Sequence, residues 1–191
     1  MKKILIGTHN VGKFKEIAYL LPKKYKKISP SKLKIKSPKE TGKSFIANAE
    51  LKVRFFSKYV NYPVISDDSG ICIQALSNRP GIYSARLAEK HGSFQNAMNF
   101  ILKKLKGKKN RKAIFVCSLS YKNEKGKIIT VQGNLHGKIS TKIIGSKGFG
   151  YDSIFIPKGK SITFGQMLRR KKIKMDHRFI AYKKLLKKTK I

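Results

Sequence analysis

The chain is poor in acidic residues, cysteine and long apolar runs, and it contains no tryptophan. Only nine Asp and Glu residues stand against 45 Lys and Arg, which gives a formal net charge of +36. The two cysteines, Cys72 and Cys117, lie in apolar stretches, and this placement argues against a disulfide scaffold or a zinc site. The apolar segment at 4–6 is too short for a signal peptide, and no apolar run approaches the roughly 18 residues of a membrane span. We therefore expect a cytoplasmic protein without a membrane partner.

The positive charge is spread along the whole chain. Only seven of the 45 basic residues are arginine, whereas proteins that read nucleic-acid sequence concentrate arginine on one element for contacts with base edges. Lysine, isoleucine and asparagine are all abundant, and they share A/T-rich codons. We interpret the lysines as a composition bias on a solvated surface, with no specific nucleic-acid partner but weak, salt-sensitive attraction to polyanions. A basic nucleic-acid-binding domain remains an alternative.

Length and an apolar content of 40% fit one compact domain over residues 1–191. The spacing of apolar residues predicts helices over 11–21, 44–59 and 96–105, and a last helix that begins at Asp176. We expect Ile180, Leu185 and Leu186 on the buried side of that last helix. Strands are predicted at 4–7, 63–66 and 153–156, and a β-hairpin at 113–121 and 127–136. This order indicates an α/β to α+β fold with a mixed sheet.

The segment 7–13 has the spacing GxxxxGK of a Walker A loop and lies between a predicted strand and a predicted helix. The next residue is Phe14, whereas a Walker A loop needs Ser or Thr there to place a hydroxyl on Mg²⁺. Thr8, Asn10 and Lys13 can still reach a phosphate, together with backbone N–H groups at the helix N-terminus. Ordinary helix-entry residues would give the same pattern, so the motif alone leaves both interpretations open.

Two of the nine acidic residues, Asp67 and Asp68, are adjacent at the end of a predicted strand. Adjacent carboxylates repel each other, so the pair suggests a bound cation and chemistry on phosphates. Neighbouring side chains of a strand point to opposite faces. Either Ser69 and Gly70 break this alternation and the carboxylates converge, or one carboxylate binds the ion while the other orients water. Mg²⁺ takes one or two carboxylates, and Glu40 is the candidate partner of Asp68. A surface turn would also explain the adjacent residues Asp67 and Asp68.

A glycine-rich stretch with two aromatic rings runs from Gly145 to Asp152. Its flexible backbone suits close approach to a phosphate, and the rings of Phe149 and Tyr151 suit stacking on a flat base. His177 and Arg178 follow the N-cap of the last helix and can donate hydrogen bonds to a ligand. A turn whose aromatic residues pack into the core, followed by solvated helix residues, is the alternative.

Taken in order, six motifs resemble those of the inosine triphosphate pyrophosphatase family, also called non-canonical purine nucleoside triphosphate pyrophosphatases, nearly from end to end. They are Thr8-His9-Asn10-Val11-Gly12-Lys13 with Glu16; Glu40-Thr41-Gly42 with Asn48-Ala49; Ser66-Asp67-Asp68-Ser69-Gly70; Pro80-Gly81-Ile82-Tyr83-Ser84-Ala85-Arg86; Gly148-Phe149-Gly150-Tyr151-Asp152; and His177-Arg178.

This resemblance implies a reaction and an architecture. The family cleaves nucleoside triphosphates such as ITP, dITP and XTP to the monophosphate and pyrophosphate with Mg²⁺, and so cleans the nucleotide pool of deaminated purines. Its members have an elongated mixed β-sheet flanked by helices, with two lobes around a central cleft, and most are homodimers. We expect the same of this chain.

The resemblance also assigns roles to residues. Asp68 would activate water and bind Mg²⁺ together with Glu40, while Asp67 would support that water or ion. Phe149 would stack on the base, and hydrogen-bond donors of the last helix would recognise its C6 carbonyl. The substrate-binding residues implied are Thr8, His9, Asn10, Val11, Gly12, Lys13, Ser69, Phe149, Gly150, Tyr151, Asp152, Lys172, His177 and Arg178.

Four positions depart from the family pattern. Asp176 replaces a Ser, Ser153 replaces a Pro and Gln166 replaces a Glu, while Lys39 stands where some members carry a second acid. None of these changes removes a residue that we assign to chemistry. A Walker-type nucleotide kinase or ATPase remains the alternative enzyme, although Phe14 disfavours it.

Overall fold

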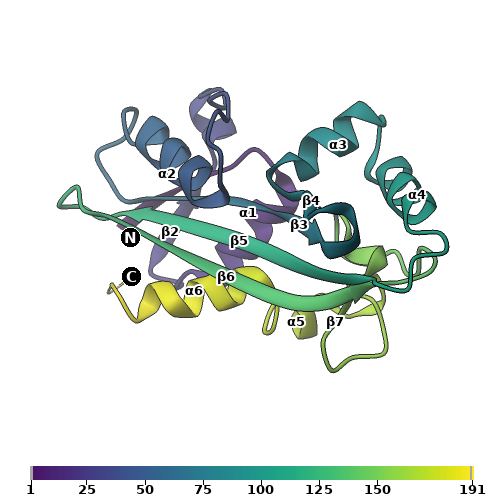
Figure 1. Ribbon diagram of the computed structural model, residues 1–191. Coiled ribbons are helices and arrows are strands. Elements are labelled where there is room, and N and C mark those ends of the chain that lie inside the picture. The colour runs from purple at the N-terminus through teal and green to yellow at the C-terminus, as the bar shows by residue number, and fades with distance from the viewer. Residues whose placement is uncertain (1, 190) are drawn as a thin grey trace. The chain divides into compact units, whose positions relative to one another are not determined.

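The computed structural model describes residues 2–189 and 191 of this chain (Figure 1). Met1, the first residue of the domain predicted over 1–191, and Lys190 lie outside the described residues. The strands are β1 (Lys2–Gly7), β2 (Tyr25–Ile28), β3 (Val64–Ile73), β4 (Arg79–Pro80), β5 (Lys112–Lys122), β6 (Ile128–Ile139) and β7 (Phe155–Pro157). The α-helices are α1 (Val11–Leu20), α2 (Phe45–Phe56), α3 (Ser84–Lys90), α4 (Phe94–Lys104), α5 (Arg169–Lys172) and α6 (His177–Leu186).

All described strands join one seven-stranded sheet in the order β2-β1-β3-β5-β6-β7, with β4 beside β3. Strand β1 pairs in parallel with β2 and β3, whereas the β3–β4 and β6–β7 pairs are antiparallel. This mixed sheet with its helices confirms the predicted α/β class. None of the described helices is long and apolar enough to span a membrane.

The chain divides into two compact units. Unit 1 comprises the residues up to Asp68 together with 117–133 and 178–191, and unit 2 comprises 69–116 and 134–177. Strands β3, β5 and β6 contribute residues to each unit. The single domain inferred from the sequence stays a prediction.

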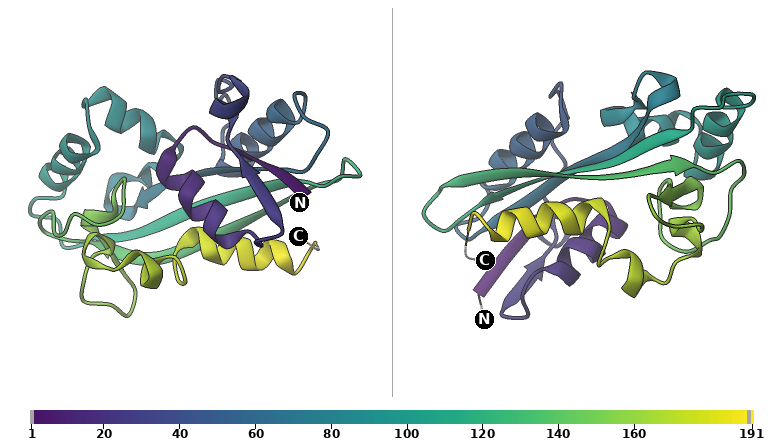
Figure 2. Two further views of the ribbon diagram at one scale, coloured as in Figure 1. Left: turned by 180° about the vertical axis from the view of Figure 1, so that it is seen from behind. Right: turned by 60° about the horizontal axis from the view of Figure 1, so that its bottom comes forward.

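In unit 1, helices α1 and α6 cover one face of the sheet and α2 covers the other (Figure 2). Strand β1 explains this layering, because successive side chains of a strand point to opposite faces. Ile4 and Ile6 pack with residues of α1 and α6, whereas Leu5 packs with Val53 and Phe56 of α2. The run Ile4-Leu5-Ile6 is therefore apolar throughout because both of its faces are buried.

Gly7 ends β1 at a point where no side chain fits. A Cβ atom there would lie 2.3 Å from Ser66 Oγ and 2.5 Å from a ring carbon of Phe56. The glycine that begins the Walker-like spacing is thus required by packing between β1, β3 and α2. Its presence is not evidence for a phosphate-binding loop.

Unit 2 has its own core, in which α4 packs on the sheet through Ala97, Met98 and Ile101. Tyr151 and Phe155 belong to the same cluster. Helix α4 begins at Phe94, two residues before the predicted start, because Ser93 caps it by accepting a hydrogen bond from Asn96 N at 3.1 Å.

The predicted end of β3 is wrong. The predicted strand covers 63–66 with the acidic pair at its end, but β3 continues through the acidic pair to Ile73. Gly70 serves close packing, since a Cβ atom there would lie 2.3 Å from Gly81 O and 2.4 Å from Ser84 Oγ. A glycine required by close packing and a glycine that ends a strand look alike in a sequence.

The structure also differs from expectation in the burial of one residue, in the start of one strand and in an additional strand. Leu186, predicted to be buried, is 45% exposed, because the buried face of α6 follows Ala181, Tyr182 and Leu185. The strand predicted over 153–156 is a 3₁₀ turn over Asp152–Ile154 followed by β7. Strand β2 was not expected, since it lies at the edge of the sheet and two of its four residues are lysines.

Candidate functional site

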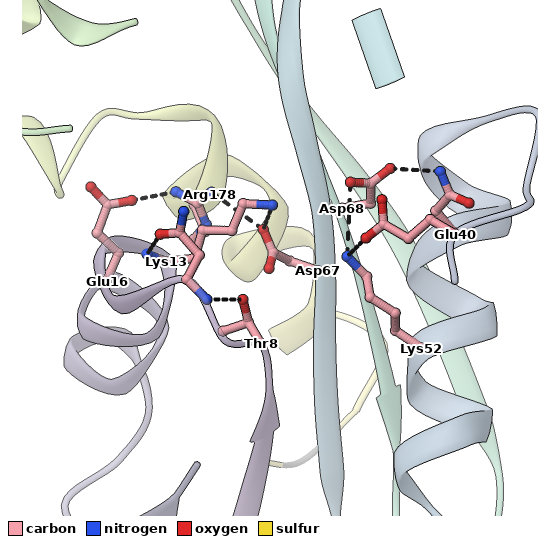
Figure 3. A network of polar contacts seen from close by, with 10 residues as sticks. Thr8, Lys13, Glu16, Glu40, Lys52, Asp67, Asp68 and Arg178 are labelled. Carbon is pink, nitrogen blue, oxygen red and sulfur yellow. Dashed lines mark hydrogen bonds and ion pairs between the residues drawn. The ribbon is translucent and has the colours of Figure 1, made fainter. Parts of the chain in front are cut away.

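The neighbouring carboxylates Asp67 and Asp68 point to opposite faces of β3 (Figure 3). Strand geometry is regular at this point, so the alternation of side chains holds. Of the two alternatives for this pair, the one in which Ser69 and Gly70 let both carboxylates converge on one ion is therefore wrong. Each carboxylate has its own partners within unit 1.

Asp67 lies in a buried group of four charged side chains. Its Oδ2 accepts a hydrogen bond from Arg178 Nη2 at 3.3 Å and lies 3.5 Å from Lys13 Nζ. Arg178 Nη1 also donates to Glu16 Oε2, which links α6 to α1. Two acids and two bases give this group a net charge of zero, as burial of charge requires.

The electrostatic setting of Asp67 keeps it ionised. Burial alone would raise the pKa of this carboxyl group, but the charges of Lys13, Arg178 and Lys52 outweigh burial and hold the pKa well below its usual range. Asp67 is thus a permanent anion that orients the two cations facing it. It faces away from the oxygen atoms of Asp68 (Figure 3).

On the other face of β3, Asp68 meets two residues of α2. Asn48 Nδ2 donates to Asp68 Oδ2 at 3.1 Å, and Lys52 Nζ lies 3.8 Å from Asp68 Oδ1. Lys52 Nζ also donates to Glu40 Oε1 at 2.6 Å. Asn48 and Lys52 are four positions apart on one helix and so present their side chains on the same face. The structure thereby brings Glu40 and Asp68 to the same ammonium group, while their role as metal ligands stays a prediction.

Asn48 also fixes the loop that carries Glu40. Its Oδ1 accepts a hydrogen bond from Gly42 N at 2.8 Å, so the amide group must turn its Nδ2 toward Asp68. Burial raises the pKa of Asp68, because the charges of Lys52 and Lys13 and the Asn48 hydrogen bond only partly offset it. A carboxylate with a raised pKa is better suited than Asp67 to accept a proton.

The carboxylate oxygens around Lys52 are suitable ligands for a divalent cation. Glu40 and Asp68 both face one ammonium group, and the three side chains sum to a charge of −1. Within residues 2–189 and 191, no group of three or more His, Cys, Asp and Glu could hold a metal. Two carboxylates suffice for Mg²⁺, which commonly takes its other ligands from water and from phosphate oxygens of a substrate.

The predicted phosphate-binding residues form a tight turn into α1. Asn10 caps the helix by accepting a hydrogen bond from Lys13 N at 3.0 Å, and Thr8 Oγ1 accepts one from Asn10 N at 3.2 Å. Val11 is 64% exposed and Gly12 is half-buried. These contacts orient the backbone N–H groups of the first helical turn, which is the arrangement that binds anions.

His9 is held by the segment before α2. Its ring nitrogens lie 2.9 Å from Ile35 O and 2.6 Å from Ser37 Oγ. The ring therefore anchors the turn at Thr8, and any contact of His9 with a ligand stays a prediction.

In unit 2, the predicted substrate-binding residues Phe149, Asp152 and Lys172 lie together. The buried Lys172 Nζ donates to Asp152 Oδ2 at 2.6 Å, and the same oxygen accepts a hydrogen bond from Phe149 N at 2.9 Å. Lys172 Nζ is also 4.7 Å from the centroid of the Phe149 ring. This buried ion pair therefore fixes the loop that presents Phe149, which is half-buried.

The remaining predicted residues are placed as follows. Tyr151 is a core residue whose hydroxyl group donates to Ser84 O at 2.7 Å. The buried His177 ring stacks on Phe115 with centroids 4.8 Å apart and planes 12° apart. Ser69 and Gly150 are half-buried. The roles of all four in substrate binding stay predictions.

No role for Lys52 follows from the sequence, and Glu16 and Asn48 occur there only as members of the family motifs. The sequence does contain a signal for Lys52, because this lysine lies on the same helix face as the buried apolar residues Ala49, Val53 and Phe56. Glu16 similarly precedes the buried Ile17 in a chain with few acids. A charged side chain on a buried helix face requires a partner, and this requirement points to a functional or structural ion pair.

This chain is similar to several known proteins over nearly its whole length. A model of the Ham1 family matches residues 4–188. The dITP/XTP pyrophosphatase of Bacillus subtilis is 40% identical over 191 residues, which cover 98% of this chain and 96% of that protein. The structure of the Staphylococcus aureus Ham1 protein has a TM-score of 0.84 at 34% identity, covering 98% of this chain and 100% of that one. A HAM1 protein from Coxiella burnetii has a TM-score of 0.87 at 29% identity, with 99% and 100% covered.

Proposed function

This chain belongs to the Ham1 family, and on that premise we propose that it hydrolyses non-canonical purine nucleoside triphosphates such as ITP, dITP and XTP to the monophosphate and pyrophosphate. The single observation that carries the proposal is the meeting of Glu40 and Asp68 at Lys52. In a chain with nine acidic residues, two buried or half-buried carboxylates from distant segments at one place favour a cation site.

The proposed reaction cleaves the linkage between the α- and β-phosphates. Asp68 accepts the proton of the attacking water, and pyrophosphate leaves with the electrons of the broken P–O bond. Mg²⁺, held by Glu40 and Asp68, would neutralise charge on the phosphate oxygens. The turn into α1, from Thr8 to Lys13, would bind the phosphates through its backbone N–H groups and Lys13.

Base recognition is proposed for Phe149, His177 and Arg178, the residues that the resemblance implies. Phe149 would stack on the purine, and the loop contacts of Asp152 and Lys172 would hold that ring in place. His177 and Arg178 would donate to the C6 carbonyl of hypoxanthine or xanthine, whereas adenine presents an amino group there. An unmade buried hydrogen bond costs about 1–3 kcal/mol, or roughly tenfold to a hundredfold in rate.

The finer expectations remain part of this proposal. Mg²⁺ as the physiological ion, a homodimer, the absence of a specific nucleic-acid partner and a cytoplasmic location stay predictions from the sequence and its resemblance. The Walker-type alternative is disfavoured further, because packing against Ser66 and Phe56 accounts for Gly7.

The decisive experiment is a product assay with ITP, XTP, ATP and GTP at equal concentration and with excess Mg²⁺. We expect pyrophosphate from ITP and XTP and much slower release from ATP. Orthophosphate as the product, or ATP cleaved as fast as ITP, would contradict the proposal. Asp68→Asn should abolish turnover while its circular dichroism spectrum matches that of the parent; retained turnover would remove Asp68 from the mechanism.

A further inference from the structure

Lys52 occupies the place where the two proposed metal ligands meet. Its Nζ lies 2.6 Å from Glu40 Oε1 and 3.8 Å from Asp68 Oδ1, and its side chain is only 8% exposed. The lysine projects from the middle of α2, whereas the carboxylates come from a loop and from β3. One ammonium group thus joins three separate segments of unit 1.

The charge of Lys52 is maintained by its surroundings. Two carboxylates, Glu40 and Asp68, lie within 4 Å of its Nζ, and both favour the charged ammonium form. Without the ammonium, Glu40 and Asp68 would repel each other in a poorly solvated place. In the absence of a metal, Lys52 therefore supplies the positive charge that keeps the pair together.

A divalent cation and the ammonium group require the same oxygen atoms. Mg²⁺ binds carboxylate oxygens at about 2.0–2.1 Å, and Lys52 Nζ is 2.6 Å from Glu40 Oε1, so an ion held by this oxygen would lie within about 5 Å of the ammonium group. Two cations at such a separation repel each other strongly in a buried setting. The long, flexible lysine side chain can move, whereas the carboxylates are fixed by β3 and the Asn48 contacts.

We propose that Lys52 is a positioning residue that acts as an internal cation, holding Glu40 and Asp68 together and leaving them when a divalent cation binds. The identity of the two ligands rests on the proposed function. Asn48 keeps the Asp68 carboxylate in place while the divalent cation replaces Lys52, because its hydrogen bond holds Oδ2 and leaves Oδ1 to change partners. The phosphate oxygens of a nucleotide are the new anions that would receive the displaced ammonium group.

The test measures Mn²⁺ binding to the nucleotide-free full chain by calorimetry and electron paramagnetic resonance. If Lys52 competes with the ion, Lys52→Met should bind Mn²⁺ at least about tenfold more tightly than the parent, since a charge-assisted contact no longer has to be broken. In EDTA, Lys52→Met should have a lower melting temperature than the parent. Addition of Mn²⁺ should raise the melting temperature of Lys52→Met by more than it raises that of the parent. Lys52→Arg, which keeps the charge, should bind as weakly as the parent.

Two controls assign the effect to this place. Lys2→Met removes the exposed partner of Glu124, whose ion pair of 3.2 Å is remote from the acidic pair, and should leave Mn²⁺ affinity unchanged. The double variant Lys52→Met with Glu40→Gln should lose the gain in Mn²⁺ affinity that Lys52→Met alone produces. Equal or weaker binding of Mn²⁺ by Lys52→Met, or no binding by either protein, would overturn the proposal.

Lys52→Gln gives a second neutral variant if Lys52→Met does not fold, and the same outcomes apply to it. Because no nucleotide is present, the measurement is independent of the reaction. Failure to release pyrophosphate from ITP would refute the proposed function without changing this result. Normal turnover with unchanged Mn²⁺ affinity would refute only the role of Lys52.

Discussion

At the residue scale, Asp67 and Asp68 are neighbours with opposite electrostatic properties. Asp67 faces Lys13 and Arg178 and has a lowered pKa, whereas Asp68 faces α2 and has a raised pKa that burial causes. The alternation of side chains along β3 creates this difference, because each face of the sheet presents a different set of charges. One carboxylate is thereby a fixed counter-charge and the other is suited to proton transfer.

We predict that Asp67→Asn lowers the free energy of unfolding by about 3–5 kcal/mol at pH 7 in EDTA, because it leaves buried cations without their partner. The folded pKa lies below the unfolded value of 3.8, so this stabilisation is complete well above pH 3.8 and is lost as pH falls through the folded pKa. Urea denaturation at several pH values should therefore give a difference in the free energy of unfolding between parent and variant that is constant near neutral pH. This difference should become smaller below about pH 4. A gap that widens on acidification would contradict the assignment.

Asp68→Asn is the matched comparison in the same strand. Burial raises the pKa of Asp68, so folding disfavours its ionised form. Asp68→Asn should therefore lower the free energy of unfolding much less than Asp67→Asn does. Equal losses for the two variants would show that the two faces of β3 are electrostatically alike.

At the scale of elements, helix α2 and the loop between β6 and β7 each hold functional side chains in a defined arrangement. Helix α2 places Asn48 and Lys52 one turn apart on its buried side, facing β3. In unit 2, the carboxylate of Asp152 joins the backbone of Phe149 to the side chain of Lys172. Each element therefore carries both the functional groups and the contacts that orient them.

Gly148→Ala should disturb the Phe149 loop specifically. Gly148 has a φ of +82°, and a Cβ atom there would lie 2.1 Å from Asp152 Oδ2, so the carboxylate must leave its contact with Lys172. We expect the KM for ITP to rise roughly tenfold or more, since the stacking ring loses its fixed position. Steady-state kinetics over a range of ITP concentrations measures this change.

Gly159→Ala is the control for backbone strain. Gly159 has a φ of +77° but has no atom within 4 Å of the added Cβ. Both variants should lose about 1–2 kcal/mol of stability from the left-handed backbone, but only Gly148→Ala should raise the KM. Equal KM values for the two variants would argue against a role of the Asp152 contacts in binding.

At the scale of the whole molecule, the net charge of +36 affects association more than folding. Diffuse lysines attract polyanions without recognising a sequence. The buried acids, by contrast, are almost all matched to particular cations, as Glu16, Asp67 and Asp152 illustrate. The surface charge and the internal charge network thus have separate roles.

We predict that the protein binds single-stranded DNA weakly and without sequence preference. Filter-binding titrations between 50 and 200 mM salt should show the affinity falling by at least about tenfold, because counterion release supplies the binding free energy. An oligonucleotide of shuffled sequence should bind equally well. Tight and sequence-selective binding at physiological salt would instead support the nucleic-acid-binding alternative.

The sequence by itself determined the fold class, the positions of α1, α2 and the β5–β6 hairpin, and the candidate pair Glu40 and Asp68. These features follow from local patterns, namely the period of apolar residues, capping side chains and the rarity of acids in this chain. The family resemblance also rests on such local motifs. Each of these signals lies within a few neighbouring residues, so it can be read before the chain is folded.

Only the tertiary structure decided which partners the charged side chains have. Arg178 meets Glu16 and Asp67 across 162 and 111 positions of the sequence, and Lys52 meets Asp68 only because α2 packs on β3. Glycines show the same limit, since Gly7 and Gly70 are required by atoms of distant segments. Local sequence determines the direction of a side chain along its own element, but its electrostatic environment depends on the elements that pack against that face.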